Sequence, residues 1–142
     1  MERNKFVCGF LFDTAHQRVA LVQKARPEWQ AGRWNGIGGK IELPETSLEA
    51  MHREFSEETG IPAGAIAWRR FVHLELENGG FVDFYSAASE AINDVCTAQD
   101  ETVSVFPHWR LPNVLYNLKW LIPMARDFSI DLATITQKPS VK

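Results

Sequence analysis

The chain has 142 residues, which is the size of one domain, and its 45% of hydrophobic residues can form one sizeable core. With 23% charged residues, the composition is that of an ordinary globular protein and excludes a disordered or fibrous class. The formal charge of −3 at pH 7 gives no general electrostatic reason to bind a nucleic acid polymer or an acidic membrane surface.

Two strand-like segments open the chain. Residues 5–13 are rich in β-forming residues, and residues 18–24 alternate between apolar and polar side chains. The four residues between them suit a hairpin. Residues 25–39 follow, with four glycines, one proline and two tryptophans, and this composition predicts a loop.

The segment 46–59 is predicted to be a helix. Thr46 and Glu49 have the T-x-x-E spacing of a capping box, and Gly60 is a typical residue after the last turn. At about 100° per residue, Leu48, Met51, Phe55 and Thr59 fall on one side, which should face the core.

The second half of the chain predicts more strands and one more helix. Residues 65–77 and 80–87 read as two strands joined through the hairpin signal Asn78-Gly79-Gly80, and residues 102–109 contain another strand. Residues 112–128 have helical spacing, and Pro123 should kink or shorten that helix. Together these elements predict a single domain, 1–142, of mixed α/β or α+β sandwich class.

Three glutamates of the predicted helix share one face. Glu54, Glu57 and Glu58 stand at i, i+3 and i+4, beside the apolar stripe. One interpretation is a solvated helix face. The other is a cation site, because only Arg53 and His52 lie close enough in sequence to offset these charges. Carboxylate oxygens are the ligands that Mg²⁺ prefers, with phosphates and water completing its shell.

Residues 39–61 resemble the signature of the Nudix hydrolases, G-x5-E-x7-R-E-U-x-E-E-x-G-U, where U is apolar. Phe55 and Ile61 fill the apolar positions, and Phe55 is bulkier than the usual aliphatic residue. The order of strands, loop and helix extends the resemblance over most of the chain. The fixed positions are all present at the required spacing: Gly39, Glu45, Arg53, Glu54, Glu57, Glu58 and Gly60.

The resemblance implies an α/β/α sandwich with a mixed sheet and a loop–helix–loop metal site. It implies that Glu54, Glu57 and Glu58 bind Mg²⁺, with Mn²⁺ as a second option and the Gly39 carbonyl as an additional ligand. Arg53 would orient glutamates, and Glu45 would have a supporting role. A further acidic ligand is expected from the loop after residue 97, where Glu101 comes first and Asp100 second. The general base stays open among Glu57, Glu58 and Glu101.

The residues before the predicted helix include candidates for recognising the base of a nucleotide. The segment 31–42 is similar to the corresponding segment of MutT-type hydrolases of oxidised purine nucleoside triphosphates, in which an asparagine can read the base. Asn35 stands at that place, although an asparagine in a loop can instead serve an unusual backbone conformation. Asn117 is a second amide for the same cleft. Stacking candidates are Trp34 and Trp29, and cations that flank the site are Lys24, Arg26, Arg33 and Lys40.

This chain departs from those hydrolases before its last helix, where it has no acidic pair. We therefore expect ordinary nucleoside triphosphates to be hydrolysed as well as, or better than, 8-oxo-guanine forms. The expected reaction gives a nucleoside monophosphate and pyrophosphate. Two alternatives remain: hydrolysis of a sugar-linked or other nucleoside diphosphate derivative, and a catalytically silent nucleotide-binding module.

Partners and location follow from weaker signals. Cys8 and Cys96 are far apart and lack metal-ligand spacing, which is typical of a reduced, cytoplasmic protein. The apolar run near the N-terminus is too short for a secretion signal, and no window approaches the roughly 18 apolar residues of a membrane span. We expect a monomer or homodimer that binds small nucleotides and neither nucleic acid polymers nor membranes.

Overall fold

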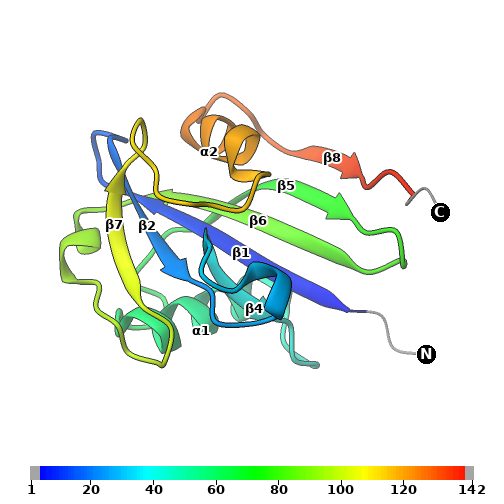
Figure 1. Cartoon of the computed structure of the whole chain (residues 1–142), viewed down its shortest axis with the longest axis horizontal. Helices are drawn as coiled ribbons and strands as arrows, with labels where there is room; N and C mark the ends of the chain where they lie inside the picture. The colour runs from blue at the N-terminus through cyan, green and yellow to red at the C-terminus, as the bar shows by residue number, and fades with distance from the viewer. Residues whose placement is uncertain (1–3, 140–142) are drawn as a thin grey trace.

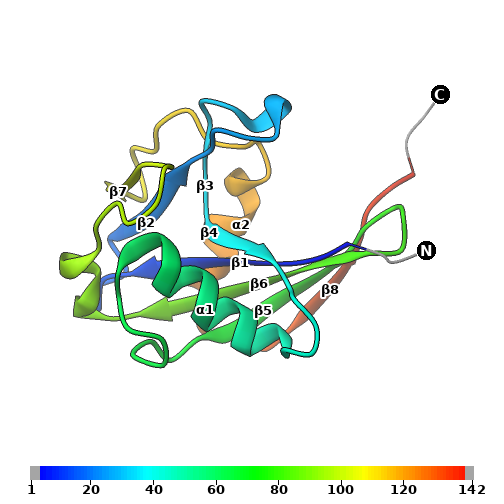
Figure 2. The same cartoon turned by 90° about the horizontal axis from the view of Figure 1, so that it is seen from below.

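The computed structural model describes residues 4–139 and shows one mixed sheet with a helix on each face (Figures 1 and 2). The strand order is β3-β2-β1-β6-β5-β8, while β4 also pairs with β1 and β7 also pairs with β2. The α/β/α sandwich expected from the sequence is confirmed. The strands are β1 (Lys5–Phe12), β2 (Arg18–Gln23), β3 (Trp34–Asn35), β4 (Ile37–Lys40), β5 (Arg69–Glu75), β6 (Phe81–Ala88), β7 (Val103–Pro107) and β8 (Ala133–Thr136). The helices are α1 (Ser47–Thr59) and α2 (Leu118–Arg126), with 3-10 turns η1 (Glu28–Gln30) and η2 (Glu90–Asp94).

Strand β1 lies at the centre of the sheet and contributes to both hydrophobic layers. It pairs in parallel with β6 and antiparallel with β2 and β4. Successive side chains of a strand point to opposite faces. Accordingly, Val7 and Leu11 pack in the layer that contains α1, whereas Phe10 and Phe12 pack in the layer that contains α2. This continuous apolar run explains why β1 is covered on both sides.

Helix α1 has the predicted boundaries. Thr46 is the N-cap, its side chain and that of Glu49 form both bonds of a capping box, and Gly60 ends the helix in the left-handed region at φ 80°. The buried side chains are Ala50, Met51, Phe55 and Thr59. The prediction for Leu48 was wrong, because its side chain is 42% exposed.

The first turn of α1 is instead held to the sheet by Ser47. Its hydroxyl lies 2.7 Å from Asp83 Oδ2 and 2.7 Å from the Tyr85 hydroxyl, both on β6. Asp83 is 1% exposed and also contacts His73 Nδ1 at 2.6 Å and Arg70 Nη1 at 3.3 Å. Because Ser47 points to the sheet, its neighbour Leu48 is turned away from it.

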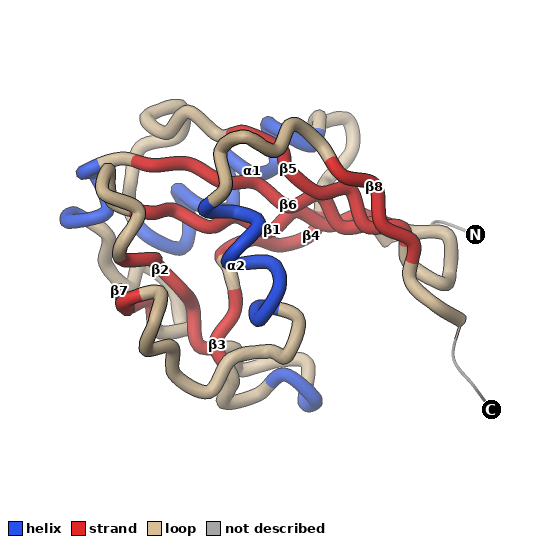
Figure 3. The backbone as a smooth tube through the Cα atoms, turned by 90° about the horizontal axis from the view of Figure 1, so that it is seen from above, coloured by secondary structure: helices blue, strands red, loops and turns tan. Residues whose placement is uncertain are grey.

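The segment 25–39 is not only a loop, which corrects the sequence prediction. It contains η1 and the short strands β3 and β4, and β4 pairs with β1 from Phe6↔Lys40 to Gly9↔Ile37. Glycine-rich strands have little β propensity of their own, so this pairing depends on the neighbouring strand. Strand β4 is therefore part of the sheet and lies beside β1 (Figure 3).

Helix α2 is shorter than predicted, and Pro123 is not the cause. The helix begins only at Leu118, since the backbone before it is bonded to β3: Trp34 N–H donates to Asn113 O at 2.8 Å and Leu115 N–H donates to Trp34 O at 3.1 Å. Pro123 lies inside the helix, which continues to Arg126. Strand β8 and turn η2 were not predicted. Neither helix in the described part of the chain has the length and apolarity that crossing a membrane requires.

The capping box of α1 yields a first prediction. Thr46→Ala removes the side-chain acceptor for Glu49 N–H and should lower the free energy of unfolding by about 1 kcal/mol. Urea denaturation followed by circular dichroism measures this change. Thr102→Ala, at an exposed position, is the control and should stay within about 0.5 kcal/mol of the parent chain. An equal loss for both variants would contradict the role of the cap.

Candidate metal and substrate site

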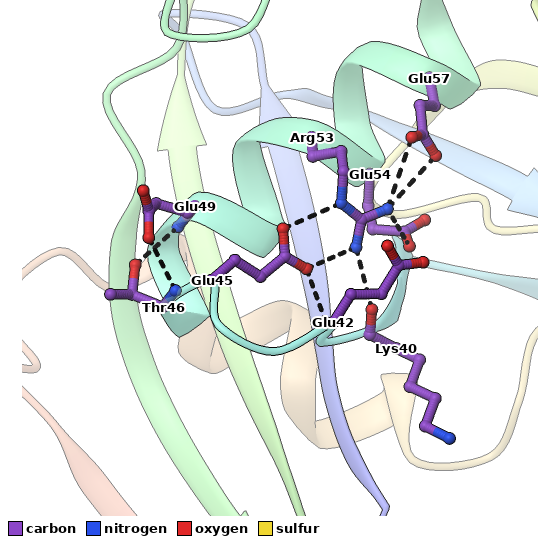
Figure 4. A network of polar contacts seen from close by, with 8 residues as sticks. All are labelled: Lys40, Glu42, Glu45, Thr46, Glu49, Arg53, Glu54 and Glu57. Carbon is purple, nitrogen blue, oxygen red and sulfur yellow. Dashed lines mark hydrogen bonds and ion pairs between the residues drawn. The ribbon is translucent and has the colours of Figure 1, made fainter.

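Arg53 is the centre of the polar network on α1 (Figure 4). Its guanidinium donates to Glu45 through Nη2 at 2.6 Å and through Nε at 3.0 Å. The same group contacts Glu54 Oε1 at 2.9 Å and Glu57 Oε2 at 3.4 Å. Nη2 also donates to Lys40 O at 3.0 Å, which ties the helix to the end of β4. A planar fork of five donors is what allows one side chain to serve so many acceptors.

The carboxyl group of Glu54 lies directly against Gly39. A Cβ atom at Gly39 would come within 2.5 Å of this carboxyl group, so a larger residue here would force the Glu54 side chain to move. Burial raises the pKa of Glu54, while the hydrogen bond and charge of Arg53 act in the opposite direction. A second positive charge beside Glu54 would therefore be favourable.

Glu58 contains an acceptor that has no partner. Its Oε2 atom is buried and makes no hydrogen bond to any of residues 4–139. Burial, and next the negative charge of Glu101, raise the pKa of the Glu58 carboxyl. A buried, unpaired carboxylate oxygen is costly and rare in folded proteins, so it favours a site that is completed by a ligand.

Glu101 and Asp100 have very different surroundings. The Glu101 side chain is 7% exposed and accepts from Lys24 Nζ at 3.1 Å and from the Ala25 N–H. Asp100 is on the surface, where it pairs with Arg26 at 3.1 Å. Glu101 is therefore a buried carboxylate whose charge acts on Glu58, whereas Asp100 is a surface residue with a smaller effect on Glu58.

The contact of Lys24 with Glu101 was missed by sequence reasoning. Strands β2 and β7 pair antiparallel with Val22 opposite Val103, so residue 24, just after β2, comes opposite residue 101, two residues before β7. Opposite charges after two predicted strands are a signal of such a pair, but the register of the two strands is not readable from the sequence.

The donor atoms suit a hard divalent cation, although they are not gathered around one point. Among residues 4–139, no three His, Cys, Asp or Glu side chains are placed to hold a metal ion as they stand. Arg53 holds Glu54 and Glu57, and Lys24 holds Glu101. The unpaired Glu58 oxygen and the carboxyl group against Gly39 fit Mg²⁺, whose ligands are oxygens.

The residues expected to face a base lie on neighbouring segments. Asn35 is in β3, and its Oδ1 accepts from Gly36 N–H at 2.8 Å and lies 3.9 Å from Cys8 Sγ. It does not have a positive φ, so an unusual backbone conformation is not the reason for an asparagine here. Asn117 precedes α2, and its buried Oδ1 is without a hydrogen-bond partner in the described range.

The aromatic and basic candidates divide into packed and exposed side chains. Trp34 is half-buried and meets Phe106 edge to face at 4.8 Å between ring centroids. Trp29 lies on η1 and is 65% exposed. Arg33 and Lys40 are exposed. Trp34 is thus a packed side chain, while the other three are surface residues.

Comparison with known proteins gives matches in sequence and structure. Residues 2–127 match the family model described as NUDIX domain. The chain is 30% identical over 114 residues to the 8-oxo-dGDP phosphatase NUDT18 of Danio rerio, covering 73% of this chain and 31% of that protein. It is 31% identical over 93 residues to the oxidized purine nucleoside triphosphate hydrolase of Mus musculus, covering 66% and 58%. These matches span less than two thirds of either relative.

A solved structure shows the same fold. The MutT protein of Bacillus halodurans superposes with a TM-score of 0.67 at 21% identity, covering 96% of this chain and 91% of the other. At this identity the likeness concerns the fold alone. It supports the arrangement of sheet and helices described above.

The Arg53 network yields a second prediction. Arg53→Lys keeps the charge but loses the fork that joins Glu45, Glu54 and Lys40 O, and should lower the free energy of unfolding by about 1–3 kcal/mol. Arg110→Lys, at an exposed position, is the matched control and should change it by less than about 0.5 kcal/mol. Chemical denaturation without added metal measures both. If Arg53→Lys is as stable as the parent chain, the network does not hold α1 to β4.

Proposed function

The chain belongs to the Nudix family, and on this premise we propose that it is a metal-dependent hydrolase that cleaves a nucleoside triphosphate to a nucleoside monophosphate and pyrophosphate. The observation that carries the proposal is the buried, unpaired Oε2 of Glu58 beside the Arg53 network and Glu101. A bound divalent cation would supply the missing partner of this oxygen, and a cation held by carboxylates suits a phosphate-bearing substrate.

In this proposal Mg²⁺, or Mn²⁺ in its place, is held by Glu54, Glu57 and Glu58. The Gly39 carbonyl and Glu101 are the additional ligands. The metal supplies neutralisation of phosphate oxygens and activation of water. Glu57, Glu58 and Glu101 are the candidates for the general base that would accept a proton from the attacking water.

Arg53 has a supporting role in the same proposal. It keeps Glu54 against Gly39 and anchors Glu45, so that the helix cannot shift relative to β4. Arg33 and Lys40 are exposed beside the site and could meet the phosphates.

The base is proposed to lie between Asn35 and Asn117, against Trp34. Asn35 Oδ1 is occupied by Gly36 N–H, which leaves its amide NH₂ group as a donor. Asn117 Oδ1 is buried without a partner in the described chain and offers an acceptor. One donor and one acceptor can recognise the edge of an ordinary base.

Hydrolysis of oxidised purine nucleotides is the second candidate, because the relatives from Danio rerio and Mus musculus are named for that activity. Sugar-linked nucleoside diphosphates are a third candidate class of substrate. The alternative to an enzyme is a catalytically silent nucleotide-binding module. The retained glutamates favour an enzyme. The free thiols of Cys8 and Cys96 are in keeping with a reduced, cytoplasmic setting. A monomer or homodimer is proposed on the sequence alone.

The role of Glu57 gives a third prediction. Glu57→Gln keeps the size of the side chain but removes its charge, and turnover at saturating Mg²⁺ should fall by about 10³-fold. Pyrophosphate release measures the effect. Glu28→Gln, at an exposed position on η1, is the control and should keep full turnover. Near-normal turnover of Glu57→Gln would remove Glu57 from the metal site.

The selectivity of the site gives a fourth prediction. In a panel of ordinary, oxidised and sugar-linked nucleotides, ordinary nucleoside triphosphates should have kcat/KM values equal to or above those of 8-oxo-guanine forms. Asn35→Ala should lower kcat/KM for the preferred base by an amount equivalent to about 1–3 kcal/mol. A preference above about 100-fold for 8-oxo-dGTP would instead support the second candidate.

A further inference from the structure

The ammonium group of Lys24 is already paired with Glu101, one of the carboxylates assigned to the metal site. Lys24 Nζ lies 3.1 Å from Glu101 Oε1, and the two side chains are only 21% and 7% exposed. The other oxygen of Glu101 accepts from the Ala25 N–H. Both oxygens of Glu101 are therefore bound by residues of the segment that leaves β2.

The ammonium group of Lys24 also affects Glu58. The charges of Glu101 and Lys24 both act on the Glu58 carboxyl group, whose Oε2 is buried and without a partner in residues 4–139. Two carboxylates in a partly buried site repel each other unless a cation is near. In the metal-free chain, Lys24 supplies that cation.

A second ion pair of the same segment, between Arg26 and Asp100, is much more exposed to solvent. Arg26 Nη2 lies 3.1 Å from Asp100 Oδ2, but these side chains are 72% and 67% exposed. Exposed pairs contribute little and are screened by salt. Removal of the Arg26 charge can thus serve as the control for removal of the Lys24 charge.

We propose that Lys24 is a resident cation of the metal site, which holds Glu101 until a divalent ion displaces it. The displaced ammonium is then free to meet the phosphates of the substrate. This inference rests on the proposed function, because it requires that Glu101 and Glu58 face the bound metal. It assigns Lys24 two opposing effects: it weakens binding of the free metal and strengthens binding of the nucleotide.

Two possible roles of Lys24 predict opposite changes in metal affinity when its side chain is removed. If Lys24 served only to position Glu101 as a ligand, its removal would loosen Glu101 and weaken metal binding. If Lys24 competes with the metal for the Glu101 oxygen, its removal strengthens metal binding. The sign of the change therefore distinguishes the two roles.

The experiment is a titration of Mn²⁺ without nucleotide, in which the electron paramagnetic resonance signal of the free ion is followed at constant pH and ionic strength. Lys24→Met should bind Mn²⁺ on the order of tenfold more tightly than the parent chain. Arg26→Met removes the same charge from the same segment and should bind it within about twofold of the parent chain. Lys24→Arg keeps the charge and should show no gain.

Thermal unfolding provides a second readout that does not depend on catalysis. In EDTA, Lys24→Met should melt below the parent chain because Glu101 and Glu58 lose their cation. In saturating Mn²⁺ the difference should shrink, because the metal replaces the missing charge. Arg26→Met should show no such dependence on metal.

The outcomes separate this inference from the function on which it rests. If the parent chain binds no Mn²⁺, the proposed metal-dependent function fails and this inference fails with it. If the parent chain binds Mn²⁺ and Lys24→Met binds it equally or more weakly, only the role of Lys24 is overturned. Tighter binding in Lys24→Met and Arg26→Met alike would also overturn it, since the effect would then be one of general charge.

Discussion

The repulsion among carboxylates is the constraint on which the rest of this structure depends. Helix α1 carries Glu54, Glu57 and Glu58 beside its buried face, and the one guanidinium of Arg53 reaches only the first two. An isolated helix with this pattern would gain little from its own i, i+4 pairs. Its position is set by burial of Met51 and Phe55, by Ser47 on the sheet and by the bond of Arg53 to Lys40 O.

Two side-chain cations pair with different members of the acidic group. Arg53 is shared by Glu45, Glu54 and Glu57, whereas Lys24 is bound to Glu101. Glu58, which neither cation binds, is the carboxylate that retains a buried oxygen without a partner in the described chain. The remaining imbalance of charge is thus local to Glu58. If Arg53 stays in place and Lys24 exchanges with a metal, as proposed, the site can accept the ion without unfolding.

The sequence predicted those features that depend on local periodicity and capping. The boundaries of α1, both hairpins and β1 follow from patterns within a few residues. It did not predict β3, β4 or the start of α2, because Gly38, Gly39 and Asn113 adopt their structure through pairing with distant strands. The spacing also placed Glu54, Glu57 and Glu58 on one helix, while their role as metal ligands stays a prediction. The partner of Glu101 was not, since it depends on the register of β2 with β7.

The two ends of the proposed substrate site are joined by one short piece of backbone. Asn35 in β3 and Gly39 in β4 are four residues apart in extended chain, a span of roughly 13 Å. Because β3 is bonded to β2 and β4 to β1, this span is fixed by the sheet. In the proposed site, the side chain at position 35 can thus change without moving Gly39. This separation gives a physical reason why one carboxylate site could serve different nucleotides, with selectivity set at the far end of β3.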